Sequence, residues 1–76
     1  MTQATARALL PVFNAWYLAR ENGTAIRDLR RLEANLWRAV ADQRLLIATD
    51  EILVGRWIAD TLGGRIDPSV GVVTNV

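Results

Sequence analysis

The stretch TAIRDLRRLEANLWRAVADQRLL, residues 24–46, decides the fold of this 76-residue chain. At 100° per residue its apolar side chains fall into one stripe, while charged and amide side chains occupy the opposite face. Such a pattern predicts an amphipathic helix with one buried side. The stripe consists of Ile26, Leu29, Leu32, Leu36 and Val40, it continues to Ile47 just beyond the stretch, and Trp37 lies at its edge.

Helix-breaking residues stand on both sides of this stretch. In Asn22-Gly23-Thr24, Gly23 suits the left-handed position after a helix, and Thr24 suits the N-cap of the next one. Thr49 is an N-cap candidate before the acidic pair Asp50 and Glu51, and Gly63-Gly64 ends the last helical pattern. We therefore predict three helices, over residues 5–22, 24–46 and 50–62.

The predicted fold class is all-α, with a helical domain over residues 1–62 and an extended C-terminal arm over residues 63–76. The helices form either a three-helix bundle or a helical hairpin with a third helix added. Pro11 either lies near the true start of the first helix or kinks it. In the arm, Val70, Val72 and Thr74 alternate like a strand that has no partner in this chain, so we expect it to join a neighbour's sheet edge or to fray.

The residue types that are missing exclude most catalytic sites. The sequence contains no Cys, His or Lys, and its single Ser is Ser69. Ser-His-Asp and Cys-His sites, Schiff-base lysines, zinc fingers and Walker-type phosphate loops are therefore excluded. The spacing of the acidic residues does not resemble a metal-binding loop. We expect no enzymatic activity, no cofactor, no metal and no small-molecule substrate.

Charge and hydropathy limit the classes of partner and the cellular location that we expect. The net charge of +1 is small for a protein that binds nucleic acid without specificity. The longest nearly apolar run, residues 8–19, is too short to span a membrane. The absence of cysteine fits a reducing, cytoplasmic location. We also expect no membrane partner. Its small size and lack of chemistry suggest a phage or mobile-element protein.

The first and third predicted helices are apolar around most of their circumference. A helix of this kind is buried on more than one side. A three-helix monomer covers one side of each helix, so we expect the remaining apolar surface to bind a protein partner or a second copy. The expected contact residues are Trp16, Tyr17, Leu53 and Trp57.

Two features allow alternatives. Trp16, Trp37 and Trp57 either share one core layer or include an anchor for an interface. The small residues Gly55 and Ala59 form a flat strip that packs either within the monomer or against a second copy.

Arg27, Arg31 and Arg38 form a row on the polar face of the second helix. We expect them at the rim of an interface, although the row could instead grip phosphates or simply be solvated. The predicted function is a small non-enzymatic interaction module, either a subunit or accessory of an assembly or an inhibitor- or antitoxin-like binder. The alternative is a helix-turn-helix-like DNA-binding regulator, which Asp50 and Glu51 at the start of the third helix disfavour.

Overall fold

The chain forms three helices followed by a β-hairpin. The computed structural model describes residues 1–45 and 50–74. The helices are α1 (Gln3–Glu21), α2 (Ile26–Asp42) and α3 (Glu51–Leu62), and the strands are β1 (Gly64–Asp67) and β2 (Gly71–Thr74). The prediction of a mostly helical fold is correct, and a small two-stranded antiparallel sheet is added to it.

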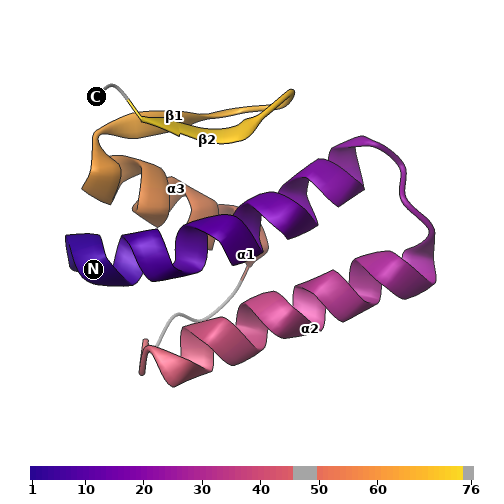
Figure 1. Ribbon diagram of the computed structural model, residues 1–76, viewed down its shortest axis with the longest axis horizontal. Coiled ribbons are helices and arrows are strands. Elements are labelled where there is room, and N and C mark those ends of the chain that lie inside the picture. The colour runs from indigo at the N-terminus through magenta and orange to yellow at the C-terminus, as the bar shows by residue number, and fades with distance from the viewer. Residues whose placement is uncertain (46–49, 75–76) are drawn as a thin grey trace.

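Helix α1 lies at the centre of the molecule (Figure 1). Helix α2 runs antiparallel along one side of it, and α3 with the hairpin covers another side. This arrangement explains why α1 is apolar nearly all round, since it is buried from two directions. The inference of burial on more than one side is therefore correct for α1, but the cover comes from the chain itself.

In the turn between α1 and α2, Gly23 has the predicted left-handed conformation, but Thr24 does not have the predicted N-cap role. Gly23 adopts a left-handed φ of 68° after α1. The backbone N–H of Thr24 then donates to the carbonyl of Ala19 at 3.0 Å, which completes the helix end. Thr24 is thereby part of the preceding cap, and Ala25 takes the N-cap position of α2 without a side-chain hydrogen bond. The prediction of Thr24 as N-cap is wrong.

Helix α2 ends at Asp42, four residues before the predicted end. Arg44 adopts a left-handed φ of 56°, and the N–H of Leu45 donates to the Val40 carbonyl at 3.3 Å. Helix α1 ends in the same way at Gly23. Here the left-handed position is taken by an arginine, which sequence rules do not predict for a helix end. Predictions for Ile47 and Thr49 lie outside the described residues.

Helix α3 starts from Asp50, whose Oδ1 accepts a hydrogen bond from the N–H of Leu53 at 3.1 Å. Helix α1 begins at Gln3, two residues earlier than predicted, because Thr2 caps it through the N–H of Thr5. Pro11 consequently lies inside α1 and not at its start.

The C-terminal segment is a hairpin, so the prediction of an unpaired extended arm is wrong. Strand β1 pairs with β2 in the register Gly64↔Thr74 to Asp67↔Gly71. The hairpin is fixed to α1, because Asn14 Oδ1 accepts a hydrogen bond from the Val72 N–H at 3.0 Å. The strand predicted to need a neighbour's sheet finds its partner within the chain.

One apolar core joins all these elements. Its largest fully buried side chains are Phe13, Leu9, Leu36, Ile58 and Val54. Ile26, predicted in the buried stripe of α2, is instead 63% exposed, because it stands at the first position of the helix. The accessible surface of 4896 Å² is close to the value of about 4,600 Å² for a compact monomer of this mass. Among the described residues, the large apolar side chains that stay exposed are Met1, Ile26, Trp57 and Val70.

Candidate interaction surface

Two of the predicted contact residues lie in the core. Trp16 and Tyr17 are only 4% and 6% exposed. They form an aromatic cluster with Phe13, whose ring centroid lies 5.8 Å from that of Trp16 and 5.6 Å from that of Tyr17. The Arg20 guanidinium lies 5.6 Å from the Trp16 ring centroid on the outer side. The prediction that Trp16 is an exposed contact is wrong, and Tyr17 is buried except at one hollow described below.

The other two predicted contacts lie on the outer face of α3. Val54, Ile58 and Leu62 point into the core. At 100° per residue, Leu53 projects on the side away from them, and Trp57 lies between that side and Val54. Trp57 is 37% exposed and Leu53 is half-buried. The three tryptophans therefore do not share one core layer, and Trp57 is the one available as an anchor.

A hollow of ≈ 300 Å³ lies beside Trp57. It is lined by Met1, Trp57, Asp60 and Thr61, where the start of the chain approaches the second half of α3. Met1 is itself 40% exposed, so this part of the surface combines two uncovered apolar side chains with one carboxylate. Within residues 1–45 and 50–74, Asp60 has no ion-pair partner. An exposed indole and a concavity thus lie next to each other.

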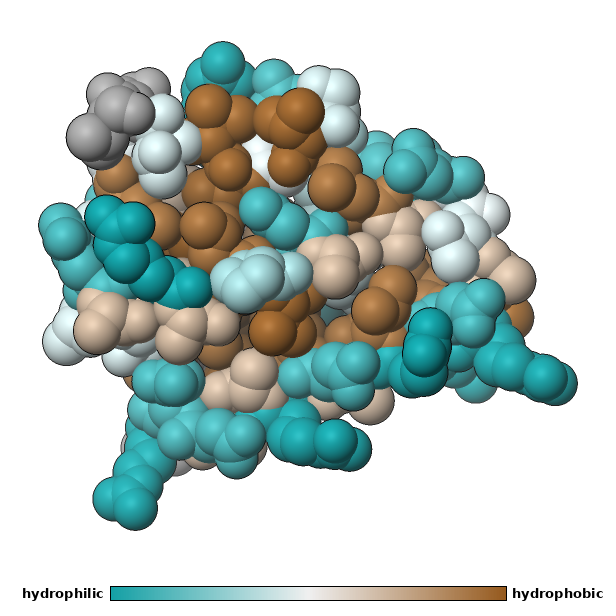
Figure 2. Space-filling view, in the orientation of Figure 1, coloured by the Kyte–Doolittle hydropathy of each residue, from teal (hydrophilic) through white to brown (hydrophobic). Residues whose placement is uncertain are grey.

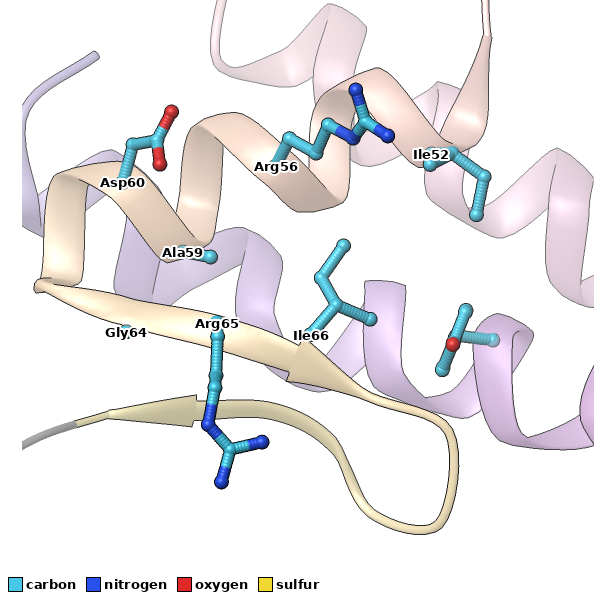
Figure 3. A pocket seen from close by; sticks show the side chains of 8 residues that line it. Ile52, Arg56, Ala59, Asp60, Gly64, Arg65 and Ile66 are labelled. Atoms are coloured by element: carbon cyan, nitrogen blue, oxygen red, sulfur yellow. The ribbon is translucent and has the colours of Figure 1, made fainter.

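A second hollow, of ≈ 450 Å³, lies on the other flank of α3. Figure 3 shows Ile66 projecting from β1 toward α3, while Arg56 and Asp60 extend from α3 and Arg65 points away from it. Tyr17 of α1 also lines this hollow. Two hydrogen bonds from Ser69 lower the pKa of the Asp67 carboxyl from its usual value of 3.8. Arg65, which donates to Asp67 at 3.2 Å, lowers this pKa to a smaller extent.

Apolar side chains also gather over the hairpin and the helices beneath it (Figure 2). Val70 at the hairpin turn is 54% exposed. The strip of Gly55 and Ala59 does not contribute to this surface, because both residues are buried against α1 and the hairpin. Of the two alternatives for this strip, packing within the monomer is correct.

The arginine row lies away from the outer face of α3. Arg27, Arg31 and Arg38 are all exposed on α2, which is on the opposite side of α1 from the hairpin (Figure 1). Arg31 has Asp28 at 3.9 Å, and neither of the other two has a carboxylate within 4.0 Å in the described part of the chain. The row does not flank Leu53 and Trp57, so the structure does not bring the predicted rim and the predicted contact residues together.

One hydrogen bond connects α2 to the start of α3. Trp37 Nε1–H donates to Glu51 Oε1 at 3.2 Å. Asp50 serves as the N-cap at the same point. Both acidic residues at the start of α3 thus have roles in the fold. Their negative charge lies at the end of the helix that would contact phosphates in a recognition helix, where it would be repelled.

Among the described residues, no three Asp or Glu side chains group closely enough to hold a metal ion. None of the described helices has the length and hydropathy to cross a membrane. The chain has no significant match to a protein-family model, to a curated protein or to a solved structure. A functional conclusion therefore rests on the surface itself.

Proposed function

We propose that the protein is a small interaction module that associates with a second copy of itself through the outer face of α3. Trp57 is the central contact residue and Leu53 supports it. The observation that carries the proposal is the adjacency of a partly exposed indole and a hollow of ≈ 300 Å³ on one face. Aromatic anchors that fill pockets dominate the binding energy of protein interfaces.

A second copy suits this face because the face presents both an exposed aromatic side chain and a hollow. In a two-fold interface the same patch serves both subunits, so each contact occurs twice. Trp57 of one copy would enter the hollow beside Trp57 of the other, which is large enough for an aromatic side chain. Its indole N–H would then donate to the Asp60 carboxylate of the second copy.

The energetics favour an apolar contact with few charges. Burial of an exposed indole removes apolar surface from water, and the Asp60 carboxylate supplies a hydrogen-bond acceptor at the edge of the hollow. Aromatic residues are enriched at interface centres and charged residues are depleted there. Leu53 and Trp57 supply the apolar part of this face, and the exposed Arg56 and Asp60 lie beside them on α3.

Sedimentation equilibrium at several concentrations tests the proposal. We expect the wild-type chain of 8.4 kDa to reach twice that mass as its concentration rises. Trp57→Asp removes the anchor and should weaken association by about 2 kcal/mol or more, roughly 30-fold. Leu53→Asp should act in the same direction. Both side chains face outward, so circular dichroism should report an unchanged helix content.

Ile26→Asp is the matched control. It makes the same change at an apolar side chain that is 63% exposed on α2, away from α3. A carboxylate on the first helical turn is favourable there. Association of this variant should equal that of the wild type. A wild-type chain that stays monomeric, or a Trp57→Asp variant that dimerises normally, would contradict the proposal.

The alternative function, DNA binding in the manner of a helix-turn-helix protein, is separated by salt. Counterion release makes binding to nucleic acid fall steeply as salt rises, whereas burial of apolar surface does not weaken in that way. Among the described residues, the exposed arginines of α2 are the feature that favours this alternative. The acidic start of α3 and its cover by the hairpin disfavour it.

A further inference from the structure

An almost fully buried tyrosine, Tyr17, lines the hollow between α3 and β1. Tyr17 is 6% exposed, and its hydroxyl makes no hydrogen bond to another residue of the described segments. The one buried side-chain polar atom there that lacks both solvent and a partner is Trp16 Nε1. The Tyr17 hydroxyl is not such an atom, and Tyr17 is one of the residues that line the hollow.

The other residues that line the hollow include one arginine, Arg56, and the apolar side chains of Ile52 and Ile66. Arg56 has no carboxylate within 4.0 Å among the described residues, whereas Arg65 is paired with Asp67. Ile52 and Ile66 lie on the two sides of the hollow (Figure 3). A buried phenol usually has a hydrogen-bond partner, and a guanidinium binds carboxylates with two parallel hydrogen bonds.

We propose that this hollow binds a monocarboxylate carried on an apolar group about the size of a leucine side chain. The carboxylate is held by Arg56 and the Tyr17 hydroxyl, and the apolar group lies against Ile52 and Ile66. The volume of ≈ 450 Å³ falls within the range of small-molecule sites. Asp60 borders both this hollow and the one beside Trp57, but the two proposed contacts, Arg56 and Tyr17, line only this one.

The charge around the hollow selects a single negative charge over a phosphate. Two positive groups, Arg56 and Arg65, are balanced by Asp60 on the rim and by Asp67. Because these charges cancel, a dianion would leave a larger uncompensated negative charge in the hollow than a monoanion. A carboxylate needs only the guanidinium and one hydroxyl donor, which this site supplies.

Titration of the full ¹⁵N-labelled chain with 4-methylpentanoate, followed by amide chemical shifts, tests the proposal. We expect millimolar binding, with the largest shifts at Arg56, Ala59, Gly64 and Ile66. The neutral 4-methylpentanamide and inorganic phosphate should each bind at least about tenfold more weakly. N-acetylglycylleucine, with a free carboxylate, separates the two sources: binding of the short acid alone indicates a free metabolite, and tighter binding of the dipeptide indicates a peptide C-terminus.

Two variants assign the contacts. Tyr17→Phe keeps the ring stacked on Phe13 and removes only the hydroxyl, and Arg56→Gln changes an exposed side chain. Each should weaken binding of 4-methylpentanoate about tenfold or more, since a hydrogen bond to a charged group is lost. Arg27→Gln on α2 is the control and should bind normally. Equal binding of the acid and its amide, shifts centred elsewhere, or unchanged binding in both variants would overturn the proposal.

Discussion

Gly55→Ala tests the contact between α1 and α3. In an exposed helix this change would stabilise the protein by about 1 kcal/mol, because glycine is a poor helix former. Here the added Cβ would lie 2.5 Å from Phe13 Cε1 and 2.7 Å from Cε2, with Cζ closer still. Ordinary carbon–carbon contacts are about 3.5–4.0 Å. The ring and the new methyl group cannot occupy these positions together.

The ring has little room to move. Phe13 is fully buried, stacked on Tyr17 and tilted against Trp16. The two helices must therefore separate, and the cost belongs at the upper end of the range of about 1–3 kcal/mol for overpacking. After the gain in helix propensity, we expect a net loss of about 2 kcal/mol. For a domain of this size that corresponds to a melting temperature lower by about 8–16 °C.

Urea unfolding followed by circular dichroism measures this loss. Phe13→Leu provides the matched background, because the smaller side chain leaves space for the methyl group. In that background, Gly55→Ala should be neutral or stabilising, so the double-mutant cycle should give a coupling energy of about 2 kcal/mol. Stabilisation by Gly55→Ala in the wild-type background would refute the reasoning, since it would mean that Phe13 does not pack on this glycine.

Three further predictions concern single polar contacts. Asn14→Ala leaves the Val72 N–H without its acceptor, so the free energy of unfolding in urea should fall by about 1–3 kcal/mol and hydrogen exchange at Val72 should be faster. The control Asn35→Ala, at an exposed position of α2, should change the free energy of unfolding by no more than about 0.5 kcal/mol. Asp67 has a lowered pKa in the folded state, so its stabilising contribution is present above pH 3.8 and is lost as pH falls through the lowered value. Carboxyl ¹³C titration should give a midpoint below 3.8 that rises in Ser69→Ala, and an unchanged midpoint would contradict the role of Ser69. Trp37→Phe should lose about 1 kcal/mol through its bond to Glu51, and Glu51→Gln, which retains an acceptor, should lose less; equal losses would argue against this bond.

The helices could be predicted because their signals are local. The apolar stripe of α2, Gly23 after α1 and the charges at the start of α3 each act within one or two turns. The early end of α2 escaped prediction because Arg44 takes a left-handed conformation that arginine seldom adopts. The N-cap at Thr24 failed since its N–H already serves the preceding helix end.

The hairpin could not be predicted from the pattern that revealed its second strand. Strand β1 is four residues long and begins at Gly64, directly after the C-cap Gly63 of α3, with Ile66 as its single large apolar residue. Such a short segment, with one large apolar residue, does not show the alternation that marks Val70, Val72 and Thr74. Asn14 was the remaining clue: a polar side chain on a nearly apolar helix, which the fold uses to hold β2.

Of the four predicted contact residues, two could be placed from local sequence pattern and two could not. Leu53 and Trp57 face outward because Val54 and Ile58 face the core, a relation that helical spacing contains. Trp16 and Tyr17 could not be placed correctly without the hairpin and α3, which cover α1. The hollow lined by Tyr17 and Arg56 joins α1, α3 and β1, so no local pattern points to it.

The most direct measurement of the central claim is ¹⁹F NMR of the chain labelled with 5-fluorotryptophan, recorded over a dilution series. The sequence contains three tryptophans, and substitution of each by Phe assigns its resonance. If the outer face of α3 binds a second copy, the Trp57 resonance moves with concentration and becomes less sensitive to solvent, while that of buried Trp16 stays constant. A Trp57 resonance that does not change at any concentration would contradict the claim.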